Sequence, residues 1–197
     1  MAVVLIPQLA PPGLNQSIRL RVTRMWNCVS PASGRIIGLA FLGTDMEGNS
    51  VYVQIGQRDV EHYRALLIEG ALYLLSAFRV SRPNINMISV RSAHVIWLTS
   101  RSVLHPINDD LGPFPRHSFA FNCEHHLRQM ANRNRFLTGM LVRDGEVNPF
   151  LNSCFATQIY VNLPINETAM VAAIYEDIDG PIEMMPPANQ PPNHPPQ

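Results

Sequence analysis

The stretch SIRLRVTRMW, residues 17–26, decides the fold of this chain. From Ile18 to Thr23, apolar residues alternate with arginine or threonine. A period of two predicts a half-buried β-strand, apolar on one face and cationic on the other. Guanidinium groups on the open face, followed by the indole of Trp26, are typical of a surface that meets nucleic acid.

Four further apolar segments read as strands, and the period changes between two of them. The expected strands cover residues 36–43, 50–56, 71–80 and 87–98. Between residues 58 and 70 the apolar spacing becomes three to four, which predicts a helix that Asp59 caps and Gly70 ends. The turn at residues 45–49 predicts a hairpin, with Gly48 free to take a positive φ. The predicted fold class is therefore all-β with small α content: a five-stranded OB-fold barrel with a helix between strands three and four.

The rest of the chain predicts less order. Residues 99–123 form a proline-rich connector with no clear element. Possible strands at 137–142 and 155–161 precede a short helical run at 167–178, too little to close a second barrel. We expect an OB-fold nucleic-acid-binding domain at residues 1–130 and a partly ordered remnant at residues 131–180. Residues 181–197 hold seven of the seventeen prolines and are expected to be a disordered tail.

Charge is balanced overall but uneven along the chain. Residues 1–105 hold ten arginines against five acids, and the remainder holds five against ten. Every fixed cation is arginine, which binds phosphate and stacks on bases better than lysine does, although codon bias explains the missing lysine equally well. The zero net charge therefore hides a basic front and an acidic back.

Cysteine usage favours an intracellular protein. Cys28, Cys123 and Cys154 are few, odd in number and far apart, which predicts reduced thiols. The N-terminus lacks the charged start of a signal peptide, and we expect no membrane-spanning segment.

Several segments in order resemble one family. They are IRLRVTRMW (18–26), DMEGNSVYVQI (45–55), YRALLIEGALYLLSAFRV (63–80), the connector from Thr99 to Val103, and HSFAFN (117–122). Together they resemble the N-terminal OB domain of plant proteins similar to the large, 70 kDa subunit of replication protein A. FATQIYVNLPINETAMV (155–171) resembles a late piece of that family's second OB domain, so the chain looks like a truncated member.

The resemblance implies a function and partners. It implies single-stranded DNA binding in replication, recombination or repair, in the nucleus. RNA and other replication protein A subunits are further candidate partners. The missing catalytic and metal-site motifs and the missing membrane-length apolar run predict no enzyme activity, no cofactor and no membrane partner. The zinc-binding C-terminal domain of full-length large subunits has no counterpart in this sequence, which puts trimer assembly in doubt.

OB barrels bind a strand across the outer face of strands two and three, between the one-two and four-five loops. Arginines contact phosphate there and aromatic rings stack on bases. The candidate nucleic-acid-binding residues are Arg19, Arg21, Arg24, Trp26, Arg35, Tyr52, Phe78, Arg79, Arg82 and Arg91.

The aromatic candidates have competing readings. Trp26 keeps the parity of the buried face of its strand, which favours a core residue over a stacking one, and the same holds for Phe78. Tyr52 is out of phase with Val51 and Val53, which predicts exposure. Trp97, within the run HVIWL, reads as core. Exposed arginines on a strand can equally be a solvated face.

Other chemistry is weakly supported. The cluster of Cys123, Glu124, His125 and His126 invites a zinc reading, but no second ligand pair stands at metal-site spacing. No nucleophile elbow, phosphate-binding loop or zinc-protease motif is present. The alternatives to nucleic-acid binding are an OB-fold protein-interaction module, with the acidic, proline-rich back half as a docking tail, or a decayed copy with little function.

Overall fold

The computed structural model describes residues 2–30, 32–83, 90, 92–108, 112, 114–117, 140–143, 150–153, 169, 170 and 173, with only the backbone given for 140–143 and 150–153. The chain divides into two units, residues 1–158 and 159–197, and the strands that the structure describes lie in the first. Among the described residues, no helix has both the length and the apolar character needed to span a bilayer.

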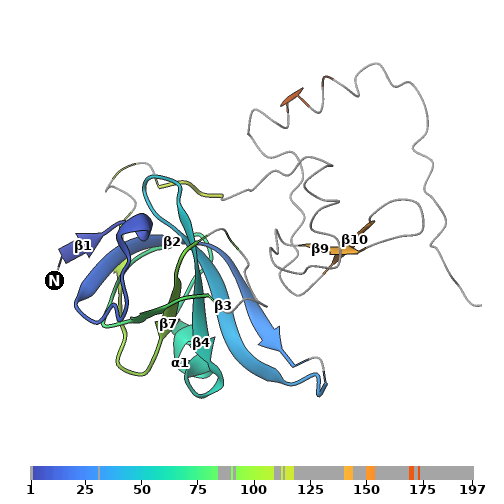
Figure 1. Cartoon of the computed structure of the whole chain (residues 1–197), viewed down its shortest axis with the longest axis horizontal. Coiled ribbons are helices and arrows are strands. Elements are labelled where there is room, and N and C mark those ends of the chain that lie inside the picture. Colours follow the sequence, from blue (N-terminus) through green and yellow to red (C-terminus); the bar gives the residue numbers. More distant parts are fainter. Residues whose placement is uncertain are drawn as a thin grey trace, which may run out of the picture. The chain divides into compact units, whose positions relative to one another are not determined.

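One curled sheet dominates the first unit (Figure 1). Its strands are β1 (Ala2–Val4), β2 (Gln16–Val29), β3 (Ile36–Thr44), β4 (Ser50–Gly56), β5 (Leu72–Ser76), β6 (Arg79–Ser81), β7 (Val95–Leu98) and β8 (Val103–Ile107). They pair in the order β6-β7-β4-β3-β2-β5-β8, and β1 pairs with β2. The helical elements are η1 (Ile6–Gln8), η2 (Gln57–Asp59) and α1 (Val60–Leu66). Strands β9 (Met140–Arg143) and β10 (Phe150–Ser153) form a separate antiparallel pair.

The sheet closes on itself because the predicted fourth strand is split. β5 pairs with β2, whereas β6 pairs with β7 at the other end of the order. Only Ala77 and Phe78 separate them, and Ala77 has a positive φ of 54°. Two residues cannot span an open sheet, so the two ends must meet. The result is the predicted OB arrangement, with the parallel pairing of β4 and β7 and with α1 between strands three and four.

A β-bulge at Thr23 reverses the faces of β2. Val22 pairs with Gly43 and Arg24 pairs with Leu42, so Thr23 is an extra residue. Before the bulge, even-numbered residues point into the barrel; after it, they point out. Trp26 therefore lies half-buried on the outer face, and its reading as a core residue from parity is wrong.

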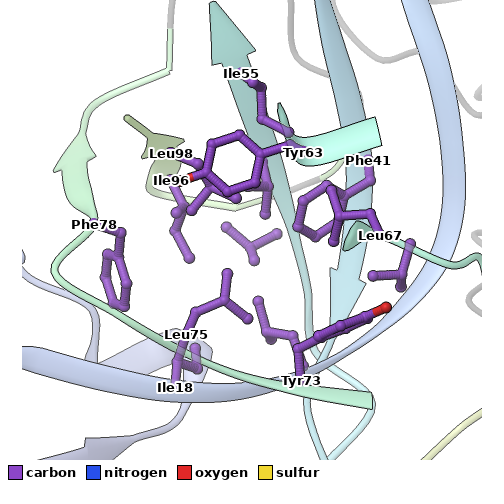
Figure 2. Close-up of a cluster of buried hydrophobic side chains, with 14 of the residues drawn as sticks. Ile18, Phe41, Ile55, Tyr63, Leu67, Tyr73, Leu75, Phe78, Ile96 and Leu98 are labelled. Atoms are coloured by element: carbon purple, nitrogen blue, oxygen red, sulfur yellow. The ribbon is translucent and has the colours of Figure 1, made fainter. Parts of the chain in front are cut away.

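The core lies inside the barrel (Figure 2). It combines inward side chains of the strands with Tyr63 of α1 and with Leu67, the residue that follows α1. The Tyr63 hydroxyl donates to the carbonyl oxygens of Thr99 and Ser102, which fixes the helix across one end of the barrel. Phe78 is fully buried here, so its core reading is confirmed.

The β3–β4 turn is built around one buried carboxylate. Asp45 is fully buried and accepts hydrogen bonds from the backbone N–H groups of Glu47 and Asn49, at 3.0 and 2.9 Å. It also accepts one from the N–H of Ile6 at 3.0 Å, which ties η1 to the turn. Gly48 has a φ of 84°, so the predicted hairpin turn is confirmed.

Several predicted boundaries change. The fifth strand, β7, begins at Val95, since the described residues 92–94 of the predicted segment are not strand, and α1 ends at Leu66, before Gly70. Asp59 is the N-cap residue, but its side chain makes no capping hydrogen bond. The connector holds a strand, β8, that its prolines obscured.

Beyond residue 123 the description is sparse. β9 overlaps the predicted strand at 137–142, and β10 was not predicted. Residues 169, 170 and 173 are helical, within the predicted run. The cysteine–histidine cluster at 123–126 and the predicted strand at 155–161 lie outside the described residues, and the domain limits at 130 and 180 stay predictions.

Candidate nucleic-acid interface

Five side chains form one row across the outer face of the barrel. Strand register pairs Trp26 with Ala40, Ala40 with Gln54, Gln54 with Trp97, and Trp97 with Arg79. Cross-strand partners project from the same face of a sheet, so β2, β3, β4, β7 and β6 each contribute one member. We call this set the aromatic row. Its tryptophans stand three strands apart, about 14 Å at the usual spacing of neighbouring strands.

Trp97 is the row's most exposed aromatic residue, and its reading as core is wrong. Its side chain is 36% exposed, whereas Ile96 and Leu98 on either side are buried. The indole N–H donates to the Ser81 hydroxyl on β6 at 2.9 Å, which fixes the ring on the surface. The apolar run concealed a strand whose side chains alternate between the core and the surface. If Ile96 and Leu98 point into the core, Trp97 between them must point out, and this is the signal that the sequence offered.

Tyr52 has the predicted orientation but not the predicted exposure. It points outward, yet it is only 5% exposed. A small outer cluster covers it, made of Cys28, Ala40 and Val95 with Trp26 packed against them. The Tyr52 hydroxyl and the Cys28 Sγ lie 3.8 Å apart, and burial raises the pKa of both groups. Tyr52 therefore supports Trp26 and does not itself offer a face to a base.

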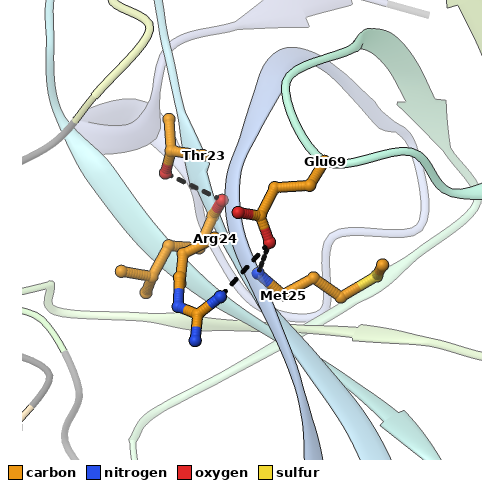
Figure 3. A network of polar contacts seen from close by, with 5 residues as sticks. Thr23, Arg24, Met25 and Glu69 are labelled. Atoms are coloured by element: carbon orange, nitrogen blue, oxygen red, sulfur yellow. Dashed lines mark hydrogen bonds and ion pairs between the residues drawn. The ribbon is translucent and has the colours of Figure 1, made fainter. Parts of the chain in front are cut away.

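Arg24 lies in the neighbouring row, paired with Leu42, and a carboxylate already holds it. Its guanidinium is 3.5 Å from a Glu69 carboxylate oxygen, and both side chains are partly exposed (Figure 3). The same oxygen accepts a hydrogen bond of 2.8 Å from the backbone N–H of Met25. Glu69 thus anchors the strand just after the bulge and competes with phosphate for Arg24.

Two predicted arginines of β2 lie elsewhere. Arg21 is buried, 5% exposed, and donates to the Gly70 carbonyl at 2.7 Å, so it holds the end of the α1–β5 loop. Arg19 is exposed but pairs with Leu74 of β5, before the bulge. It therefore belongs to the β2–β5–β8 part of the sheet, away from the aromatic row.

The remaining candidates divide between the two loops and the core. Arg35 is exposed in the β2–β3 loop, and Arg82 is exposed directly after β6. Phe78 is fully buried, so it cannot stack on a base. Arg91 lies outside the described residues. Among the predicted residues, then, the row unites Trp26 and Arg79, with Tyr52 beneath, and adds Gln54 and Trp97, which sequence reasoning missed.

Metal chemistry finds no support in the described part of the chain. No group of three or more histidine, cysteine or acidic side chains is placed there to hold an ion.

Comparison with known proteins supports the fold. No protein-family model matches the sequence, and no curated protein matches it significantly. The chain is similar to a solved structure described as a replication protein A heterotrimer bound to ssDNA, with a TM-score of 0.58 at 14% identity, over 88% of this chain and 55% of that one. It thus spans about half of that chain's length.

Two further solved structures give weaker likenesses. DNA-binding domain A of Saccharomyces cerevisiae replication protein A gives a TM-score of 0.43 at 18% identity, over 55% of this chain and 96% of that one. Fission yeast Pot1 with ssDNA gives 0.41 at 10% identity, over 55% and 40%. The chain has an OB fold, similar to that of replication protein A.

Proposed function

We propose that this protein binds single-stranded nucleic acid, DNA in the first instance, across the outer face of its barrel. The observation that carries the proposal is the aromatic row, in which two partly exposed indoles and the exposed Arg79 lie in one line over five strands. Bases stack on such rings for about 1–3 kcal/mol each, with little regard to sequence.

The row is bordered by further cations at the two loops where OB domains usually hold a strand. Arg35 lies in the β2–β3 loop and Arg82 at the start of the β6–β7 loop, both exposed. Their contacts to phosphate would release counterions, so affinity would fall as salt rises. A role in replication, recombination or repair in the nucleus, alone or with replication protein A subunits, belongs to this proposal, as does the absence of enzyme activity.

The test is fluorescence anisotropy of the full chain with labelled oligo-dT at low and moderate salt. We expect binding that weakens with salt and a loss of affinity for Arg79→Glu. The matched control is Arg101→Glu, an exposed arginine in the turn between β7 and β8, off the aromatic row. If oligo-dT does not bind at low salt, or if both variants weaken it equally, the proposal is wrong.

The competing function is a protein-interaction module. Leu66 ends α1 and Ile68 lies two residues beyond it; their side chains are 46% and 66% exposed, and neighbouring exposed apolar side chains can mark a protein-interaction site. A chain that ignores oligo-dT but loses a protein partner on Ile68→Ser would favour this alternative.

A further inference from the structure

Gln54 stands at the centre of the aromatic row, between two residues that differ greatly in size. Register places Ala40 on one side and Trp97 on the other. Its chain neighbours Val53 and Ile55 are fully buried in the core, so Gln54 points outward, where it is half-buried.

The amide of Gln54 has hydrogen-bonding capacity that the described part of the chain leaves unused. A glutamine amide offers two donor hydrogens and one acceptor oxygen. Gln8 and Gln16 use theirs on backbone groups: each accepts an N–H, and Gln16 also donates to a carbonyl. No side-chain hydrogen bond or ion pair joins Gln54 to the residues that the structure describes.

A base stacked on Trp97 would lie next to this amide and take water away from it. A polar group that loses its water without gaining a hydrogen bond raises the free energy of the complex. A base that cannot hydrogen-bond the amide would therefore bind less tightly. Because of its position on the row, Gln54 would favour bases whose edge can hydrogen-bond its amide.

We infer that Gln54 is a specificity-determining residue that hydrogen-bonds the edge of one unstacked base, with adenine preferred. This inference rests on the proposed function. Adenine carries its 6-amino donor between two ring nitrogen acceptors, N1 and N7, so a glutamine amide can pair with it through two bonds on either edge. Cytosine and thymine offer a matching donor and acceptor on one edge only.

The experiment removes one hydrogen-bonding group from the base and the matching groups from the protein. Labelled dT oligonucleotides of about nine nucleotides, within the usual range for one OB domain, carry a single central adenine or a purine that lacks the 6-amino group. The full chain, Gln54→Met and the control Gln57→Met, an exposed residue of η2, are titrated with both.

We expect the unaltered chain and Gln57→Met to bind the adenine oligonucleotide roughly threefold to tenfold more tightly than the purine one, as befits one hydrogen bond. Gln54→Met should bind the two equally. Equal binding of both by the unaltered chain, or a preference that survives Gln54→Met, overturns the inference while leaving the proposed function intact. Failure of the unaltered chain to bind either oligonucleotide rejects the proposed function itself.

Discussion

The rings of Trp26 and Tyr52 lie with their centroids 5.9 Å apart and their planes inclined by 37°, and Trp26 is the ring that reaches solvent. Tyr52 fills the surface beneath it and is almost fully covered. The two residues therefore have different roles: Tyr52 supports the indole of Trp26 from below, and Trp26 presents its ring to solvent.

Replacing Trp26 by alanine should weaken oligo-dT binding by about 1–3 kcal/mol, because one stacking surface is lost. Anisotropy at constant salt measures this, and circular dichroism checks that the variant is folded. Trp26→Phe, which keeps a ring, should retain most of the affinity. Equal affinity for Trp26→Ala and the unaltered chain would show that Trp26 is only a packing residue.

Glu69→Gln should strengthen binding at low salt by about two- to threefold and steepen its salt dependence, because the carboxylate that competes with phosphate for the Arg24 guanidinium loses its charge. The amide oxygen can still accept the Met25 N–H, so the strand stays anchored. The measurement is log affinity against log salt concentration, where one more phosphate contact changes the slope by about 0.7 for a single strand. An unchanged slope would mean that Arg24 does not reach the nucleic acid.

Stability should fall in alkali. Burial raises the pKa of Tyr52 and of Tyr63 above the ordinary value of 10.0, which the unfolded chain retains. The unfolded state therefore releases these protons first, so the stability that the two hydroxyls contribute is present below about pH 10 and is lost as pH rises above it. Urea unfolding between pH 8 and pH 11 should show a smaller total decrease for Tyr52→Phe than for the unaltered chain, by about 1–1.5 kcal/mol, most of it above pH 10. The same slope in both proteins would contradict the burial of this hydroxyl.

Asp45→Ala should lower the free energy of unfolding by about 2–4 kcal/mol, since three backbone N–H groups lose a charged acceptor. Urea denaturation gives the value. Asp59→Ala is the matched control, because that side chain makes no capping hydrogen bond, and its cost should stay below about 1 kcal/mol. Similar losses at both sites would show that the turn does not depend on its carboxylate.

The alternation of apolar and polar residues correctly predicted most strands of the barrel, because an apolar residue at every second position shows directly which face of a strand is buried. It failed where the backbone departs from a regular strand. The bulge at Thr23 moved Trp26 outward, and the break at Ala77 divided one predicted strand into β5 and β6. Nothing in the local residue types marks either irregularity, because pairing across the sheet decides both.

The candidate site was harder to predict, because a row across five strands depends on register. Gln54 and Trp97 are 43 positions apart in the chain yet adjacent in the sheet. The roles of the arginines were the hardest to predict. The sequence shows that Arg21 and Arg24 are charged, but not that Arg21 donates to the Gly70 carbonyl or that Arg24 pairs with the Glu69 carboxylate.

The most direct measurement uses the chain's own fluorescence. Trp26 and Trp97 are its two tryptophans, and both belong to the aromatic row. Titration with oligo-dT at low salt should quench most of the tryptophan emission, and Trp26→Phe and Trp97→Phe should each retain part of the quenching, because each leaves one indole to stack. Emission that stays unchanged at saturating oligo-dT, or quenching that is the same for double-stranded DNA, would contradict the account.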